Sequence, residues 1–346
     1  MTFWDLIVSF VGLGVLIYHT WSRRHAATKS KVGALPLVSI IVPCRNEESH
    51  IPDLIQSLKK LRDVNAEIIV VDDQSVDRTY ELAVKENIKV IKAPEKPQGW
   101  VGKSWACAVG AKAARGEFFL FTDADTRHMP ASLASALDFM REKNADLLSA
   151  PPYHLCLNWW EKSLGLFHLL PLVAAGFPGS RNKHRVYAIG QYLLISRQAY
   201  VAVGGHEELR SSLTEDIELA QKIIDKNLCY TIFPSATLYQ VQMYDSVKEF
   251  WQGWKRLLRL GMKKVTFWAF IEVTLMFALF FQWNWSVLVA LPTLMLMQRK
   301  HGAFAWWGAF LAPLSLLLFA LLSAAGVIEN LRKKKVTWQG REYVEI

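Results

Sequence analysis

The sequence predicts an α/β domain with apolar membrane helices on both sides of it, and three observations lead to this fold class. Between residues 36 and 240, short β-branched runs alternate with segments of helical periodicity. Membrane-length apolar stretches precede and follow this region and raise the apolar fraction of the 346-residue chain to 52%. Pairs of aspartates follow two of the apolar runs within the region. We therefore expect one ligand-binding α/β domain held at a membrane.

Residues 1–22 are predicted to be an N-terminal transmembrane anchor. Their first part is apolar except for Asp5 and Ser9. A cleavable signal peptide is the alternative, but its basic residues precede the apolar run, whereas Arg23 and Arg24 follow this one. Basic residues on that side also place the α/β domain in the cytoplasm. The expected location is the cell (inner) membrane, with several crossings.

The region at 36–240 is expected to be a parallel α/β fold. Residues 38–43 and 68–71 are too short for helices and too apolar for edge strands, so they are predicted to be central parallel strands. A helix over 50–61, capped by Ser49, connects them in a βαβ unit. The elements expected next are a helix from about 77, a strand at 88–91, a helix at about 104–114 and a strand at 117–122.

Four aspartates are expected at one edge of this sheet. Asp72 and Asp73 follow the second strand, and Asp123 and Asp125 follow the strand at 117–122. Open α/β sheets bind ligands at the carboxyl ends of their strands. Two carboxylates separated by one small residue suit Mg²⁺ or Mn²⁺ held against a diphosphate, because these hard cations prefer oxygen ligands. A strand-end turn is the structural alternative for such a pair.

The chain becomes apolar again after the α/β domain. Residues 241–264 are predicted to be an amphipathic interfacial segment, 265–330 C-terminal membrane helices, and 331–346 a basic cytoplasmic tail. Three apolar stretches make up the second of these regions. Three full crossings would put the basic tail outside, so we expect an even number. The first two stretches then form one broken span or a re-entrant hairpin, or one of them is interfacial.

The net charge of +9 predicts a membrane partner. The basic residues gather at the edges of the apolar stretches, and no basic helix or aromatic-basic array accompanies them. Anionic lipid is therefore the expected partner, and nucleic acid is not.

A series of short motifs follows in order along residues 38–260. The motifs are Pro43-Cys44-Arg45-Asn46-Glu47, Val71-Asp72-Asp73, Gly102-Lys103, Asp123-Ala124-Asp125, Gly204-Gly205-His206, Thr214-Glu215-Asp216 and Gln252-Gly253-Trp254-Lys255-Arg256. This series resembles the motifs of the family 2 glycosyltransferases, which have the GT-A nucleotide-diphospho-sugar transferase fold. The resemblance implies a metal-dependent hexosyltransferase with a UDP-sugar as donor and Mg²⁺ or Mn²⁺ as cofactor.

The resemblance assigns a nucleotide pocket to the first two motifs. An aspartate of the second motif would hydrogen-bond the uracil or ribose of the donor. Ser75 and Asp77, just downstream, have two interpretations: contact with the nucleotide, or a turn and helix cap. The implied pocket residues are Pro43, Arg45, Glu47, Asp72 and Asp73.

The resemblance places the metal and diphosphate among later motifs. Asp125 would be the direct metal ligand, and Asp123 would contact the ribose or a metal-bound water. Lys103, just before a helix, would meet a phosphate, and a solvated surface lysine is the alternative. Lys255 and Arg256 would bind the diphosphate from the last motif.

Asp216 is the implied general base. In an inverting transfer, a carboxylate removes the proton from the acceptor hydroxyl as its oxygen attacks the anomeric carbon. The structural alternative is that residues 214–216 form only the first turn of a helix, where acidic residues favour the dipole. That alternative is the stronger one for Glu215. Apolar residues at helical spacing follow, so the helix can begin at the cleft with Asp216 exposed.

Transfer of one sugar to a membrane-dissolved acceptor is the expected reaction. Processive synthases of the family carry Gln-x-x-Arg-Trp, whereas Leu257 stands here after Arg256, and the apolar stretches are too few for a polymer channel. Residues 164–176 are as apolar as the spans but too short to cross. They form either a core helix or an interfacial segment that admits the acceptor.

Residues 149–154, 204–206 and 336–343 resemble the carotenoid (4,4'-diaponeurosporenoate) glycosyltransferase subgroup. This resemblance implies transfer of glucose from UDP-glucose to a carotenoid carboxylate or hydroxyl. Other glycolipid or hopanoid glycosyltransferases and processive polysaccharide synthases remain as alternatives.

Overall fold

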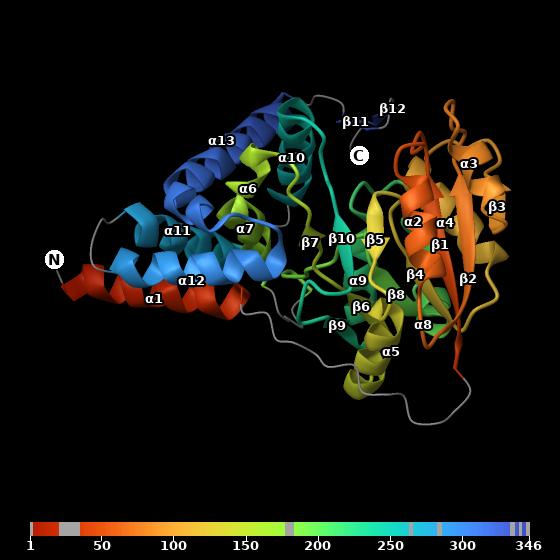
Figure 1. Ribbon diagram of the computed structural model, residues 1–346, viewed down its shortest axis with the longest axis horizontal. Helices are drawn as coiled ribbons and strands as arrows, with labels where there is room; N and C mark the ends of the chain where they lie inside the picture. Colours follow the sequence, from red (N-terminus) through yellow and green to blue (C-terminus); the bar gives the residue numbers. More distant parts are fainter. Residues whose placement is uncertain are drawn as a thin grey trace.

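A seven-stranded mixed sheet forms the centre of the α/β domain (Figure 1). The computed structural model describes residues 3–20, 35–176, 183–262, 266–281, 286–332, 336–338 and 341–343. The strand order is β3-β2-β1-β4-β8-β6-β9. The strands are β1 (Leu37–Cys44), β2 (Asn65–Asp72), β3 (Lys89–Lys92), β4 (Phe118–Phe121), β6 (Leu147–Ser149), β8 (Leu193–Ser196) and β9 (Tyr230–Ile232).

Strands β3, β2, β1 and β4 pair in parallel, as the sequence predicts for the first half of the domain. Strand β8 runs antiparallel to both β4 and β6, which makes the sheet mixed. The helices of this domain are α2 (Ile51–Lys59), α3 (Thr79–Lys85), α4 (Gly102–Ala113), α5 (Ser132–Lys143), α8 (Arg197–Ala202), the 3₁₀ turn η1 (Gly205–Glu207) and α9 (Glu215–Asp225).

Side chains of the central strands alternate between two buried faces. Ile41 belongs to the hydrophobic cluster on the face that α4 covers. Ile40 and Val42 belong to the cluster on the opposite face, together with α2 and α5. Burial on both faces explains why these strands are continuously apolar. The expected Ser49 cap is wrong, because α2 begins at Ile51 with His50 at the N-cap and no side-chain cap hydrogen bond.

A small second sheet links the end of β4 to the segment that leads to the helices beside the α/β domain. Its strands are β5 (Thr126–His128), β10 (Tyr239–Val241) and β7 (Tyr153–His154), with β10 in the middle. Strand β5 follows Asp125 directly, and β10 leads to residues 242–246 and then to α10 (Val247–Met262). The pairing of β5 with β10 therefore brings the start of α10 to the carboxyl edge of the main sheet.

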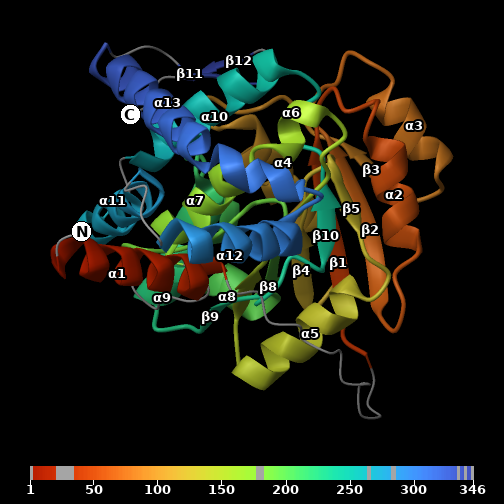
Figure 2. The same cartoon turned by 60° about the vertical axis from the view of Figure 1, so that its left-hand side comes forward.

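A group of apolar helices packs beside the α/β domain, with α7 at its centre (Figure 2). Helix α7 contacts α1, α11, α12 and α13, and its residues Leu169, Leu170 and Val173 are fully buried. This position fits the core-helix interpretation of residues 164–176. The helices are α1 (Phe3–Thr20), α6 (Trp159–Lys162), α7 (Gly165–Ala175), α10, α11 (Phe267–Phe281), α12 (Ser286–His301), η2 (Trp306–Leu311) and α13 (Ala312–Leu331).

One helical stretch among the described residues, Trp306–Leu331, is long and apolar enough to cross a membrane. Helices α11 and α12 meet that condition only as a pair, and they are bent by 115° relative to each other. The apolar part of α1, Ile7–Thr20, is shorter. The N-terminal anchor and the number of crossings stay predictions. The basic residues Arg23 and Arg24 and those at 333–335 lie outside the described residues.

Candidate active site

A cavity of about 1440 Å³ opens at the carboxyl ends of β1, β2 and β4. It brings together most of the residues that the motifs select. Two of the predicted residues, Asp72 and Lys255, lie outside its lining. The predicted residues that line it are Pro43, Arg45, Glu47, Asp73, Lys103, Asp123, Asp125, Asp216 and Arg256.

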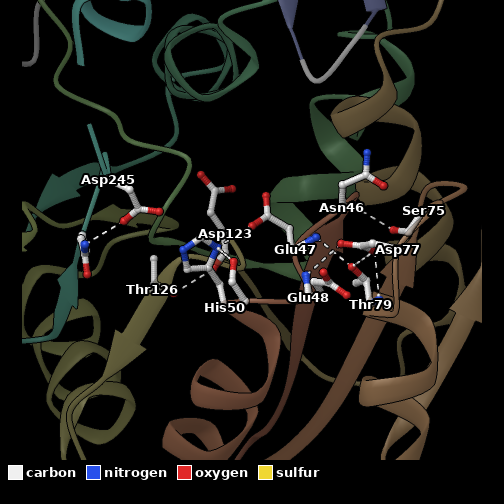
Figure 3. A network of polar contacts seen from close by, with 12 residues as sticks. Asn46, Glu47, Glu48, His50, Ser75, Asp77, Thr79, Asp123, Thr126 and Asp245 are labelled. Atoms are coloured by element: carbon white, nitrogen blue, oxygen red, sulfur yellow. Dashed lines mark hydrogen bonds and ion pairs between the residues drawn. The ribbon is translucent and has the colours of Figure 1, made fainter. Parts of the chain in front are cut away.

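Hydrogen bonds hold the loop after β1 against the loop after β2 (Figure 3). The backbone N–H of Asn46 donates to Ser75 Oγ at 3.0 Å, and that of Glu48 donates to Asp77 Oδ2 at 3.1 Å. Asp77 Oδ1 also accepts from the N–H of Thr79 at 3.0 Å, at the start of α3. Ser75 and Asp77 thus hold the turn, as one of their two interpretations expects, while the N-cap position of α3 is Arg78.

The two aspartates after β2 have different surroundings. Asp72 is buried, and its Oδ2 accepts from the N–H of Ser75 at 3.4 Å. Asp73 faces the cavity. The backbone carbonyl of Asp73 accepts a hydrogen bond of 2.7 Å from Arg45, which fixes the loop from the β1 side. The sequence pattern predicts the pair but not which member reaches the cavity.

Arg341 is a site residue that sequence reasoning missed. It lines the cavity, and its Nη1 donates to Asp73 Oδ2 at 2.5 Å. Residues 336–343 carried a family resemblance in the sequence, but nothing in their spacing placed an arginine at the end of β2.

Lys103 lies in the first turn of α4 and connects two acidic segments. Its Nζ is 2.8 Å from Asp123 Oδ1 and 3.2 Å from Glu215 Oε1. Burial by itself lowers the pKa of Lys103, but the carboxylates of Asp123, Glu215 and Asp216 raise it well above its ordinary value. Lys103 is therefore a charged ion-pair residue and not a solvated surface lysine. Glu215 is buried, and it pairs with Lys103 in addition to standing at a helix start.

Asp125 has the surroundings of a metal ligand. Its Oδ1 is buried and has no hydrogen-bond partner among the described residues. Burial, with the nearby charges of Asp123 and Glu47, raises the pKa of Asp125 to about 7. A divalent cation would supply both the missing partner and the opposite charge.

The described residues hold no group of three or more His, Cys, Asp or Glu that could bind a metal. A cation at the Asp123–Asp125 pair would therefore take its remaining ligands from bound phosphates or water, as Mg²⁺ commonly does.

Asp216 lies at the N-terminus of α9 with its carboxylate fixed by backbone donors. Oδ2 accepts from the N–H of Gly190 at 2.9 Å, and Oδ1 accepts from the N–H of Ile217 at 2.8 Å. Burial and then the neighbouring Glu215 raise the pKa of Asp216 to about 6. A carboxylate with this pKa is ionised at neutral pH and is basic enough to accept a proton.

Helix α10 presents Arg256 to the cavity and turns Lys255 away from it. Lys255 Nζ pairs with Glu329 Oε1 of α13 at 2.9 Å. Burial lowers the pKa of Arg256. Of the two cations predicted to bind the diphosphate, only Arg256 is in the cavity.

The same cavity continues into the apolar helices. Its far part is lined by side chains of four helices that pack together beside the α/β domain. They include Pro171 and Leu172 of α7, Leu257 and Leu260 of α10, Phe270, Val273 and Phe277 of α11, and Phe319 of α13.

Residues 39–204 match the model of the family named Glycosyl transferase family 2. The carboxylates at the strand ends, the basic N-terminus of α4 and the mixed sheet all lie within or beside this stretch. This match confirms the predicted resemblance to the family 2 glycosyltransferases over these residues, and the GT-A-like fold expected from the motifs is confirmed.

Curated relatives named 4,4'-diaponeurosporenoate glycosyltransferase are similar to the whole chain. The one from Staphylococcus haemolyticus is 28% identical over 74% of this chain and 71% of its own length. The one from Staphylococcus aureus is 25% identical over 98% of this chain and 96% of its own. These matches confirm the predicted resemblance to that subgroup.

A solved mannosyltransferase from Pyrobaculum calidifontis, in complex with GDP-Man and Mn²⁺, has a similar fold. It matches 95% of this chain and 98% of its own with a TM-score of 0.58 and 16% identity. At that identity the match supports the fold alone.

Proposed function

We propose that this protein is an inverting, metal-dependent hexosyltransferase that moves one glucose from UDP-glucose to a membrane-embedded lipophilic acceptor, such as a carotenoid carboxylate or hydroxyl. The observation that carries the proposal is the continuous cavity, acidic and basic at the strand ends and apolar between α7, α10, α11 and α13. A long apolar acceptor with one polar end matches this division. The names of the relatives also support a carotenoid acid as acceptor.

The donor would lie at the strand ends. Asp73 and Arg45 would contact the nucleoside, and Arg256 would meet the diphosphate. Mg²⁺ or Mn²⁺ bound by Asp125, with Asp123 beside it, would offset the charge that builds on the departing UDP. Lys103 holds Asp123 in place through their ion pair.

Asp216 would act on a hydroxyl acceptor as general base. The acceptor oxygen bonds to the anomeric carbon on the face opposite UDP while its proton passes to the Asp216 carboxylate. The bond between that carbon and the phosphate oxygen breaks, and its electron pair leaves with UDP. A carboxylate acceptor is already ionised near neutral pH and has no proton to give. Asp216 is thus essential for a hydroxyl acceptor and less so for a carboxylate.

The proposal includes a multi-pass location in the cell (inner) membrane, with the catalytic domain on the cytoplasmic side and anionic lipids at the basic edges. The apolar half of the cavity supports it, because an acceptor dissolved in lipid could enter between the helices without crossing water.

The test is the mass of the product. Membranes containing the protein would receive labelled UDP-glucose and either a carotenoid acid or a hydroxylated carotenoid. We expect the pigment to gain one hexose, and EDTA to stop the reaction. A long polymer would instead indicate a processive synthase, and a sugar on another lipid would replace the carotenoid in the proposal. Membranes without the protein are the control.

A further inference from the structure

The end of the chain reaches the nucleotide side of the cavity. Strands β11 (Val336–Trp338) and β12 (Arg341–Tyr343) pair in an antiparallel hairpin. Figure 1 shows this hairpin between α10 and the strand ends of the α/β domain. Arg341, the first residue of β12, lines the cavity.

Arg341 binds two residues of the loop that follows β2. Its Nη1 donates to Asp73 Oδ2 at 2.5 Å, and its Nη2 donates to Gln74 Oε1 at 3.3 Å. The side chains of Arg341 and Asp73 are 21% and 5% exposed, so the pair is largely shielded from water. A shielded pair of a guanidinium and a carboxylate holds its geometry better than one on the surface.

Because Gly102 has no side chain, the ion pair between Asp73 and Arg341 fits beside it. A Cβ atom at Gly102 would lie 2.4 Å from Asp73 Oδ2 and 2.6 Å from Arg341 Nη1. The N-terminus of α4, the end of β2 and the C-terminal hairpin therefore meet at one point. Three segments that are far apart in the sequence contribute to this corner of the cavity.

We propose that Arg341 is a positioning residue of the nucleotide site, which orients the Asp73 carboxylate for a nucleoside diphosphate. The inference rests on the proposed function. Without Arg341, Asp73 would be a buried carboxylate facing an anionic ligand in a cavity that already contains Asp123, Asp125 and Glu215. A guanidinium suits the task because its planar fork sets the direction of the bound carboxylate.

The experiment measures UDP binding to the full-length protein in detergent with Mn²⁺ and without acceptor. We expect Arg341→Ala to raise the Kd for UDP about tenfold, and Arg341→Lys to raise it less, because a hydrogen-bonded charge is lost in the first case and only the fork geometry in the second. Arg62→Ala, which removes an exposed arginine of the α/β domain, is the matched control and should leave the Kd unchanged. In turnover, the KM for UDP-glucose should rise more than kcat falls.

The substitution Gly102→Ala disturbs the ion pair between Arg341 and Asp73 without replacing either residue. The added methyl group must displace the ends of two side chains and not backbone, so the domain should still fold. We expect the UDP affinity to fall, and to fall by a smaller factor when Gly102→Ala is added to Arg341→Ala, because the methyl group then meets Asp73 alone. Independent effects would multiply instead.

Equal or tighter UDP binding by Arg341→Ala would overturn the inference, and tighter binding would show that the contact competes with the nucleotide. The inference would also be overturned if Gly102→Ala weakened UDP binding equally in the wild-type protein and in the Arg341→Ala variant. If the wild-type protein binds no UDP, the proposed donor is wrong, which is a different failure.

Discussion

Asp125 and Asp216 both have raised pKa values, but their contacts suit them to different chemistry. Asp216 accepts two backbone hydrogen bonds that fix its direction, and its pKa of about 6 leaves it ionised at neutral pH. Asp125 has a buried oxygen atom without a partner among the described residues, beside the like charge of Asp123. The first arrangement suits the proposed general base, and the second suits the proposed cation ligand.

The activity on a hydroxyl acceptor should follow the ionisation of Asp216. Because the base must be deprotonated, the rate should fall about tenfold for each pH unit below about 6 and level off above it. Asp216→Asn should lower kcat by roughly 10²–10⁴-fold while UDP binding survives. Initial rates between pH 5 and 8 and UDP titrations check both statements. A variant that keeps full turnover of the hydroxyl acceptor would contradict the base assignment.

The substitution Asp125→Asn should raise the melting temperature of the metal-free protein. The pKa of Asp125 is raised in the folded protein, so its ionisation destabilises the metal-free fold increasingly as the pH rises from about 4 to about 7. At pH 8 the Asn variant should therefore melt about 2–4 °C higher than the metal-free wild type, a shift equivalent to roughly 1 kcal/mol.

Mn²⁺ should stabilise the wild type and leave Asp125→Asn unchanged. Thermal melting with EDTA and with Mn²⁺ measures both effects. A variant that is still stabilised by Mn²⁺ would show that the cation binds elsewhere.

At the scale of elements, periodicity predicts the first half of the domain well and the rest poorly. Strands β1, β2 and β4 are apolar on both faces, and this pattern can be recognised in a short stretch of sequence. Strands β5 and β7 have three residues and two, which is too short for any period. The antiparallel insertion of β8 between β4 and β6 depends on contacts between distant segments, which periodicity does not contain.

The candidate site, like the fold, could be predicted from the sequence only in part. The aspartate pairs and Asp216 follow from motifs, but the side that each residue faces does not. Lys255 and Arg256 are neighbours on α10, and the position of α13 decides that Lys255 pairs with Glu329 while Arg256 enters the cavity. Arg341 required the folded chain, because 268 positions separate it from Asp73.

The apolar half of the cavity can be tested on α7. Ala174 lines the cavity and is half-buried, so Ala174→Trp should fill part of the acceptor space. We expect the KM for a carotenoid acceptor to rise about tenfold or more, with UDP binding unchanged, since the proposed donor site lies at the strand ends. Val201→Trp is the control, because Val201 is 70% exposed on α8. Unchanged acceptor kinetics in Ala174→Trp would place the acceptor outside this cavity.

At the scale of the whole molecule, the contact between Arg341 and Asp73 bears on the membrane topology. Asp73 belongs to the α/β domain, and Arg341 follows the last apolar helix. Two residues in an ion pair lie on the same side of a membrane. If the apolar helices cross a membrane, the chain must therefore cross it an even number of times between the domain and the hairpin. Helix α13 with the bent pair α11 and α12 as one broken span gives two crossings. A re-entrant α11–α12 pair would give only one crossing, so this alternative from the sequence does not fit the contact.

Cysteine labelling distinguishes these arrangements in intact cells. In a Cys229→Ser background, Arg62→Cys would report the side of the α/β domain and Arg332→Cys the side of the tail, since both arginines are exposed and the other three cysteines are buried. If the domain is cytoplasmic and the number of crossings is even, a membrane-impermeant maleimide should label neither position until the cells are permeabilised. Labelling of Arg332→Cys alone in intact cells would mean an odd number of crossings. The ion pair between Arg341 and Asp73 could then not form in the membrane. The same result would therefore contradict both the even number of crossings and the proposed role of Arg341 in the nucleotide site.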